Sequence, residues 1–238
     1  NLKVAIAIMD YPKSLLYTVA STCVIVVLQI LNAALAGYAF ARLEFKGSKL
    51  LFALAIFTII VPPSSVMLPQ YILFRNFDIF GVFKALTGDR LNLLGKPASM
   101  WILAALGQGV YAGLFIYIFR QFFRGLPKEL EEAAYIDGAG FLRTYFQIIL
   151  PVAKPGLSTA AVLQFLLAWN EFLYAIVLTN SKSNRTIPVA LGYFTSQFSF
   201  DYTAMFAAIV MVSIPSIIIY VILQEQVIES LTAGSVKG

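Results

Sequence analysis

Four long stretches of this sequence contain no charged residue, and they constrain the fold more than any other feature. They cover residues 14–41, 50–74, 97–119 and 202–224, and a fifth, 155–170, continues through Glu171 to residue 181. The hydrocarbon core of a bilayer is about 30 Å thick, and roughly 20 apolar residues in a helix cross it. Helices also satisfy their own backbone hydrogen bonds in lipid. The sequence therefore predicts an all-α membrane protein with five transmembrane helices.

The rest of the composition agrees with this prediction and excludes several kinds of chemistry. Charged residues make up only 12% of the chain, about half the share that is typical of soluble domains. The sequence has no histidine, which removes the most common metal ligand and general base. Its single cysteine, Cys23, lies within a predicted span and cannot form a disulfide framework. We expect no metal site and no catalytic residue, and the net charge of +5 indicates contact with lipid headgroups, not with nucleic acid.

The number of predicted spans decides on which side of the membrane each end of the chain lies. An odd number places the two ends on opposite sides, so we expect a further span upstream of Asn1 and treat residues 1–238 as one transmembrane domain. The basic residues divide almost evenly between the two sides, which decides little by the positive-inside rule. Two tight basic clusters, residues 42–49 and 120–128, follow the first and third spans. They favour the cytoplasmic side for those two loops.

The loop between the third and fourth spans, about residues 125–151, carries a short polar helix. Pro127 can open this helix, because the N–H that proline lacks would be unpaired in the first turn. Three glutamates follow, and negative charge suits that end of a helix. Gly138 suits the other end because glycine adopts a positive φ without a steric penalty. A plain connection needs only a few residues, so this loop predicts a projecting helix–turn–helix element that docks on another protein.

One face of the predicted polar helix is small and mostly apolar. It contains Leu130, Ala133, Ala134 and Asp137, which recur at i, i+3, i+4 and i+7. Small side chains allow another backbone to come close to this face. A second apolar segment, residues 141–150, then leads to the prolines that precede the fourth span.

Residues 131–155, EEAAYIDGAGFLRTYFQIILPVAKP, resemble the EAA motif of binding-protein-dependent ABC importer permeases. The motif consists of EAA, three residues, G, and a hydrophobic segment that ends in a proline. In that family the segment is a coupling helix, which sits in a cleft of a separate cytoplasmic ATPase subunit. The resemblance implies an ATPase-coupling site at Glu132, Ala133, Ala134, Asp137, Gly138, Ala139 and Pro151.

Other segments resemble the carbohydrate branch of the family, of the maltose-permease-G-like type. They are VPPSSVMLPQYILF (61–74), RQFFRGLPKELEEAA (120–134), AWNEFLYAIVLT (168–179), NRTIPVALGYF (184–194) and ESLTAGSVKG (229–238). Between Phe83 and Lys96 the chain is more polar than is typical of the family. The likeness implies a MetI-like ABC permease core, with the coupling helix between helices three and four and a cytoplasmic tail at about 225–238.

The fourth predicted span contains polar residues that suit a sugar pathway. Gln164, Asn170 and Glu171 supply amides and a carboxylate, and Tyr174 lies four residues after Asn170 on the same helical face. Aromatic faces, amides and carboxylates are the groups that hold sugars. A carboxylate within a span is costly and indicates a function by default. Two structural alternatives stay open for Glu171, namely solvation near the outer interface and a bond to a partner permease.

Prolines and glycines mark two further features of the spans. Pro62 and Pro63 interrupt the second apolar run, and either a pathway wall or a kink near the outer end of an ordinary helix would explain them. Gly109 and Gly113 form a small-xxx-small pair in the third run. This pair predicts close helix packing within the subunit.

Together these features imply the transmembrane permease subunit of an ATP-driven ABC importer for sugars or oligosaccharides, with several passes through a bacterial cytoplasmic membrane. The resemblance implies as partners a second homologous permease, two ATP-binding subunits, an extracytoplasmic solute-binding protein, the sugar and membrane lipid. Gly95-Lys96 fails the phosphate-loop pattern, so we expect no cofactor in this chain. ATP and Mg²⁺ would bind to the ATPase subunits.

Three other functions remain in view. An ion- or proton-coupled secondary transporter would need intramembrane charge pairs or broken-helix repeats in both halves, and the sequence offers only Glu171. An ABC importer for a non-sugar solute would keep the coupling motif but not the carbohydrate-type segments. A purely structural membrane anchor leaves the coupling motif unexplained.

Overall fold

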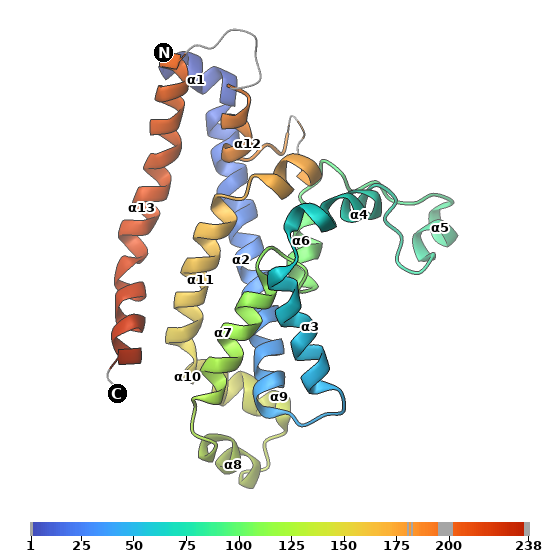
Figure 1. The fold of residues 1–238 in the computed structure, drawn as a ribbon, viewed down its shortest axis with the longest axis vertical. Coiled ribbons are helices and arrows are strands. Elements are labelled where there is room, and N and C mark those ends of the chain that lie inside the picture. The colour runs from blue at the N-terminus through green and yellow to red at the C-terminus, as the bar shows by residue number, and fades with distance from the viewer. Residues whose placement is uncertain (1, 180, 182, 195–201, 236–238) are drawn as a thin grey trace. The chain divides into compact units, whose positions relative to one another are not determined.

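The computed structural model describes residues 2–179, 181, 183–194 and 202–235, with the backbone alone for Leu223 and for residues 225–235. Over this part of the chain the fold is helical, as Figure 1 shows, and the one strand-like pairing is an isolated antiparallel bridge between Phe77 and Leu91. The prediction of an all-α chain is confirmed. In order, the elements are α1 (Leu2–Met9), α2 (Tyr11–Arg42), α3 (Ser48–Ile60), α4 (Pro63–Arg75), α5 (Val82–Thr87), α6 (Ala98–Ala105), α7 (Ala112–Arg124), α8 (Glu129–Ile136), α9 (Phe141–Thr144), the π-helical turn η1 (Tyr145–Ile149), α10 (Leu150–Val152), α11 (Lys154–Trp169), the π-helical turn η2 (Ala175–Thr179), α12 (Ile187–Gly192) and α13 (Tyr202–Ser235).

Two helices are long and apolar enough to span a membrane unaided. In the described residues these are α2 and the stretch 202–222 of α13. Two bent pairs of helices pass the same test together, α3 with α4 and residues 141–152 with α11, and they raise the number to four if each pair is one span. Length and apolarity therefore support the first and last predicted spans most directly.

The second apolar run breaks at its prolines. Pro62 is extended, with φ −62° and ψ 133°, and α4 begins at Pro63. This agrees with the bias of a residue before proline toward extended conformations and with the preference of proline for the first helical position.

The structure corrects the prediction of one continuous helix over residues 97–119. The run forms α6 and α7, and residues 106–111 between them leave the helical conformation. Gly107 and Tyr111 have φ values of +67° and +63°. Each glycine in a helix interior costs about 1 kcal/mol relative to alanine, so the LGQG sequence weakens the helix at this point.

The fourth predicted helix is also interrupted. α11 ends at Trp169, and a new helical segment begins at Leu173 and leads into η2. The sequence predicted that Asn170 and Tyr174 share one helical face. This prediction is wrong, because the helix is interrupted between them. A charge-free run shows that the side chains of a segment transfer readily into lipid. It does not show where the backbone leaves the helical conformation.

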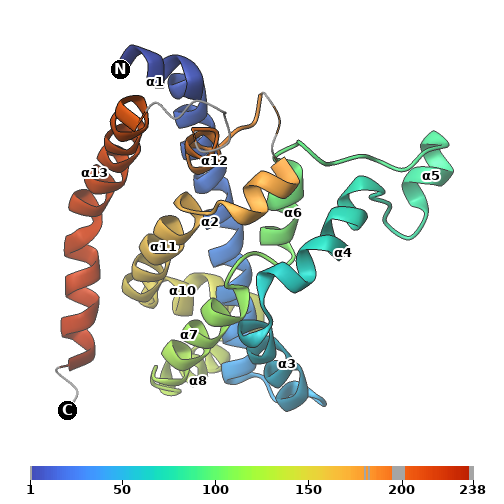
Figure 2. The ribbon, with the colours of Figure 1, turned by 45° about the horizontal axis from the view of Figure 1, so that its top comes forward.

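The chain forms two compact units. The first comprises residues 1–29, 61–110 and 165–222, and the second comprises 30–60, 111–164 and the end of the chain from 223. The first unit contains a buried cluster in which α1, α12 and the beginning of α13 pack around Trp169. The other buried members of this cluster include Ala5, Met9, Ile187, Ala190, Ala204 and Ala208. A second cluster of the same unit gathers Phe74, Leu93, Leu103, Tyr174 and Leu178. Within this unit, α4 leads out to α5 in both views (Figures 1 and 2).

The second unit packs α3 on α7 and α8 on η1. Two glycines permit close packing of its helices. A Cβ on Gly37 would lie 2.6 Å from Phe119 Cβ, and a Cβ on Gly113 would collide with the carbonyl oxygen of Ala55 in α3. The predicted close packing is thus confirmed at Gly113.

Candidate functional site

Helix α8 is the polar helix that the sequence predicts between the third and fourth spans. It begins at Glu129, two residues after Pro127, with Lys128 as its N-cap. Its first turn contains Glu129, Glu131 and Glu132. Negative charges there interact favourably with the positive end of the helix dipole, so the local sequence explains where the helix begins.

The end of α8 is a Schellman motif built around Gly138. The N–H of Gly138 donates to the carbonyl of Tyr135 at 3.0 Å, and the N–H of Ala139 donates to the carbonyl of Ala134 at 2.9 Å. Gly138 has φ +77°, in the left-handed region. No atom of the described residues lies within 4 Å of the place where a Cβ would be. Backbone conformation alone, not lack of space, therefore requires glycine at this position.

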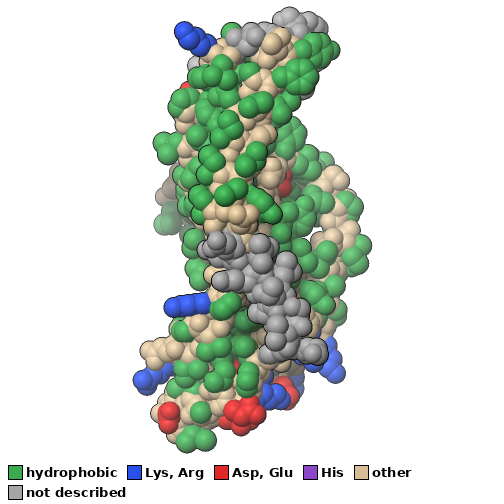
Figure 3. Space-filling view, turned by 90° about the vertical axis from the view of Figure 1, so that its left-hand side faces the viewer, with side chains coloured by type: hydrophobic (Ala, Val, Ile, Leu, Met, Phe, Trp, Pro, Cys, Tyr) green, Lys and Arg blue, Asp and Glu red, His purple; other side chains and the backbone are tan. Residues whose placement is uncertain are grey.

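The residues of the predicted coupling site divide between the surface and the interior. Ala134 is buried at 3% exposure, and Ala139 is half-buried. The side chains that remain exposed are Glu132, Ala133, Asp137 and Pro151, together with Gly138. In Figure 3, charged side chains gather at the end of the second unit that carries α8.

Exposed apolar side chains lie next to these polar residues. Ile136 is 85% exposed, Leu142 63% and Phe146 53%. Isolated apolar side chains are common on protein surfaces, but these three lie within eleven residues of one another, on α8, α9 and η1, which favours a surface for a protein partner. These positions lie within the EAA motif, but the motif does not fix which residues they carry, so the sequence did not single them out.

A buried ion pair joins α8 to the end of α2. Arg42 Nε lies 3.0 Å from Glu131 Oε1, and the two side chains are only 6% and 12% exposed. The Nε–H does not point at this oxygen, so the contact is an ion pair and not a hydrogen bond. Arg42 also donates from Nη2 to the carbonyl of Leu126 at 2.6 Å. These contacts attach the short helix to a membrane-spanning one.

An aromatic cluster lies beside this ion pair in the same unit. The ring of Tyr38 is 5.4 Å from the rings of Phe123 and Phe141 and 4.9 Å from the ring of Tyr145, measured between centroids. All of these except Phe141 are almost fully buried. Offset and edge-on aromatic contacts of this kind resist deformation because interiors are closely packed. The cluster fixes α2, α7, α9 and η1 to one another at the base of α8.

A second arginine strengthens the contact between α7 and its neighbours. Arg120 donates from Nε to the carbonyl of Phe40 at 3.2 Å, and its guanidinium lies 4.0 Å above the ring of Phe52. In the sequence, Arg42 and Arg120 stand out only as basic residues that indicate topology. Their partners are far away in the sequence, so no local pattern could have identified these contacts.

The four predicted substrate residues do not form one cluster. Gln164 belongs to the second unit and is 2% exposed, and its Oε1 has no hydrogen-bond partner in the described part of the chain. Asn170, in the first unit, is exposed and donates from Nδ2 to the carbonyl of Leu166 at 2.8 Å. This bond satisfies one of the free carbonyls at the end of α11. Asn170 therefore has a local structural role.

Glu171 and Tyr174 are connected, but through the backbone. Glu171 Oε1 accepts a hydrogen bond from the N–H of Tyr174 at 2.9 Å, as an N-cap does at the first turn of a helix. The ring of Tyr174 is buried in the cluster with Phe74 and Leu178. A capping role therefore explains the position of this carboxylate without a substrate.

We expect Glu171→Gln to retain near wild-type uptake and thermal stability, because glutamine keeps a side-chain oxygen that can accept the same bond. Glu171→Leu should lose about 1 kcal/mol of stability, the usual cost of removing a helix cap. Thermal unfolding and uptake of both variants test this. A large loss of uptake by Glu171→Gln with unchanged unfolding would restore the substrate-path hypothesis.

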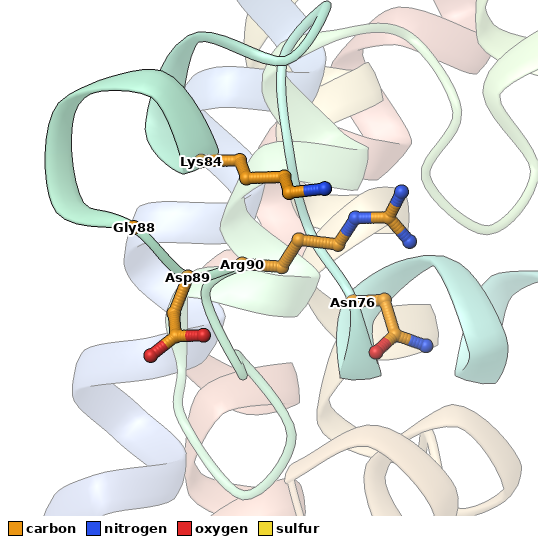
Figure 4. Close-up of a pocket in the computed structure, with 5 residues that line it drawn as sticks. All are labelled: Asn76, Lys84, Gly88, Asp89 and Arg90. Carbon is orange, nitrogen blue, oxygen red and sulfur yellow. The ribbon is translucent and has the colours of Figure 1, made fainter.

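An open pocket of about 490 Å³ lies on the loop that follows α4, lined by Asn76, Lys84, Gly88, Asp89 and Arg90. Figure 4 shows the side chains of Lys84 and Arg90 extending in the same direction, with Asp89 turned away from them. All five residues are exposed. Exposed cations of this kind are well solvated, so the pocket needs no ligand to explain it. It overlaps the segment from Phe83 to Lys96 that departs from the carbohydrate-type pattern.

No three Asp, Glu or Cys side chains come together as metal ligands would in the part of the chain that the structure describes.

Comparisons with known proteins relate this geometry to function. Residues 33–231 match the family model of the binding-protein-dependent transport system inner membrane component. The chain is 34% identical over 230 residues to the trehalose transport system permease protein SugB of Mycobacterium tuberculosis, covering 96% of this chain and 78% of the relative. It is 34% identical over 215 residues to the arabinooligosaccharides transport system permease protein AraQ of Halalkalibacterium halodurans, covering 90% of this chain and 70% of that protein.

A solved structure has a similar fold. It belongs to a bacterial ABC transporter involved in the import of the acidic polysaccharide alginate, and the match has a TM-score of 0.69 at 23% identity. The match covers 90% of this chain and 74% of that chain. The similarity at this identity supports the helical fold described above.

Proposed function

Because this chain belongs to the family of binding-protein-dependent transport system inner membrane components, we propose that it is the transmembrane permease subunit of an ATP-driven importer of sugars or oligosaccharides. The observation that carries this proposal is the family match over residues 33–231, which includes all of α8. The names of the trehalose and arabinooligosaccharide relatives support carbohydrate as the substrate class.

In this proposal α8 is the coupling helix. Its exposed residues, with Ile136 and Leu142 beside them, dock in a cleft of an ATPase subunit. Closure of the ATPase subunits on ATP pushes α8, and the buried Arg42–Glu131 pair and the Tyr38 cluster transmit the displacement to α2 and α7. Packed helices move as rigid bodies because closely packed interiors deform little. The displacement of α8 therefore rotates membrane helices and opens the pathway first to one side of the membrane and then to the other.

The partners follow from the same proposal. A second homologous permease completes the pathway, two ATP-binding subunits hold ATP and Mg²⁺, and an extracytoplasmic solute-binding protein delivers the sugar. This chain spans a bacterial cytoplasmic membrane several times and carries no nucleotide site of its own. In support, Ile214, Ile217, Ile218 and Ile222 are half to two-thirds exposed along α13, as expected for a helix that faces lipid or a second membrane subunit.

Reconstitution tests this function. The chain is purified from the membranes of its own host with the subunits that accompany it, and the complex is placed in lipid vesicles with the solute-binding protein. We expect an ATP-hydrolysing subunit in the purified complex and sugar transport that requires ATP on the cytoplasmic side. Transport driven by an ion gradient without ATP would contradict the proposal.

A further inference from the structure

Gln29 is a buried amide that nothing described so far explains. It lies within α2, in the first unit, and is 0% exposed. Among the residues that the structure describes, neither its amide nitrogen nor its amide oxygen has a hydrogen-bond partner. A buried polar group without a partner destabilises a protein by about 1–3 kcal/mol. An apolar side chain of the same size would be less costly to bury at this position, which makes the amide a candidate for binding a group that is not protein.

The amide packs against the break between α6 and α7. A Cβ on Gly109 would collide with Gln29 Oε1 and would lie 3.3 Å from the Cα of Ala104. Gly109 therefore provides the space that the amide occupies. The backbone beside it is irregular, since Gly107 has φ +67°. Irregular backbone at membrane depth is tolerated where it is buried in protein or lines a pathway.

From these two observations we propose that Gln29 is a substrate contact, whose amide binds hydroxyl groups of the sugar during transport. This inference rests on the proposed function. An amide offers one acceptor and two donors, which match the hydroxyl groups of a carbohydrate. In this structure the amide is closed off, so the contact forms when the segment between α6 and α7 moves. Glycines suit a segment that has to change its backbone angles.

The test replaces the amide with an apolar side chain of similar size. Gln29→Met in the reconstituted complex, at saturating solute-binding protein, should lower sugar transport about tenfold, the loss expected when hydrogen bonds are removed. ATP hydrolysis stimulated by the binding protein should keep its wild-type rate, and the unfolding temperature should stay the same or rise. Gln121→Met, at an exposed position of α7, is the control and should transport like the wild type.

Gly109→Ala tests the same contact from the other side, because the added methyl group displaces the Gln29 amide. The double variant Gln29→Ala/Gly109→Ala removes both the collision and the amide. We expect it to recover the unfolding temperature of the wild type while its sugar transport stays low. Recovery of transport in the double variant would show that Gln29 acts only through packing and would overturn the proposal.

Wild-type transport by Gln29→Met would also overturn it and would indicate that the amide binds only a water molecule. If the wild-type complex shows no ATP-driven transport, the proposed function itself fails. This outcome differs from wild-type transport by Gln29→Met, which contradicts only the substrate contact.

Discussion

Replacing Gly138 with valine is expected to reduce ATP-driven uptake at least about tenfold while the chain stays in the membrane. Gly138 has φ +77°, a conformation that costs a β-branched residue on the order of 1–3 kcal/mol. The variant relieves this strain by leaving the left-handed conformation, which breaks the bonds from Gly138 to Tyr135 and from Ala139 to Ala134. The end of α8 then changes direction, and its exposed surface no longer fits the ATPase subunit on which we propose that it docks. Uptake and the amount of protein in isolated membranes are the measurements.

Gly140 provides the matched control for this prediction. It has φ −76° and ψ 167°, an extended conformation open to any residue, and no atom lies within 4 Å of where its Cβ would be. Gly140→Val therefore adds the same side chain two residues away without strain, and we expect nearly normal uptake. An equal loss in both variants would mean that added bulk, and not backbone conformation, disturbs the docking surface.

Removing one partner of the Arg42–Glu131 pair should have the second large effect. Arg42→Met leaves a carboxylate that is only 12% exposed without its counter-charge, and breaking a buried pair in this way costs about 3–5 kcal/mol. We expect a clearly lower unfolding temperature and strongly reduced uptake. Glu131→Met should act similarly, because it leaves the guanidinium uncompensated. Thermal unfolding of the purified complex and uptake measure both effects.

The double variant Arg42→Met/Glu131→Met separates the ion pair from other effects. Replacing both charges by apolar side chains is often nearly neutral for stability, so the double variant should unfold at a higher temperature than either single variant. Its uptake should remain below that of the wild type if the pair transmits force to α2. Arg124→Met, at an exposed position of α7, is the control and should be close to wild type. Additive losses in the double variant would show that the two residues act independently.

The features that the sequence could predict are those that depend on neighbouring residues. Charge-free runs predicted the membrane-spanning character of α2 and α13, because transfer into lipid depends on the side chains of one segment. Gly138 predicted the end of α8, because glycine adopts the positive φ that ends a helix whatever packs against it. The resemblance around residues 131–155 predicts an ATPase-coupling surface on the same segment, and that role stays a prediction. Each conclusion needed no knowledge of what packs against the segment.

Other features could not be predicted from neighbouring residues. The helix breaks at residues 106–111 and after Trp169 lie inside runs that read as continuous spans, since hydropathy measures transfer to lipid and not backbone conformation. Asn170 and Glu171 suggested a sugar site by residue type. In the structure each makes a local bond that caps a helix, which is an equally good use of the same groups.

The sequence by itself determined that the chain is helical, apolar enough for a bilayer and equipped with a short polar helix that ends at Gly138. Only the tertiary structure decided that Arg42 meets Glu131 and that Tyr38 packs at the base of α8. It also decided that the amide of Gln29 is buried against Gly109, with no hydrogen-bond partner among the described residues. The physical reason is that solvation and backbone preference act within a segment. Ion pairs, ring contacts and buried amides are decided by which distant segments pack together.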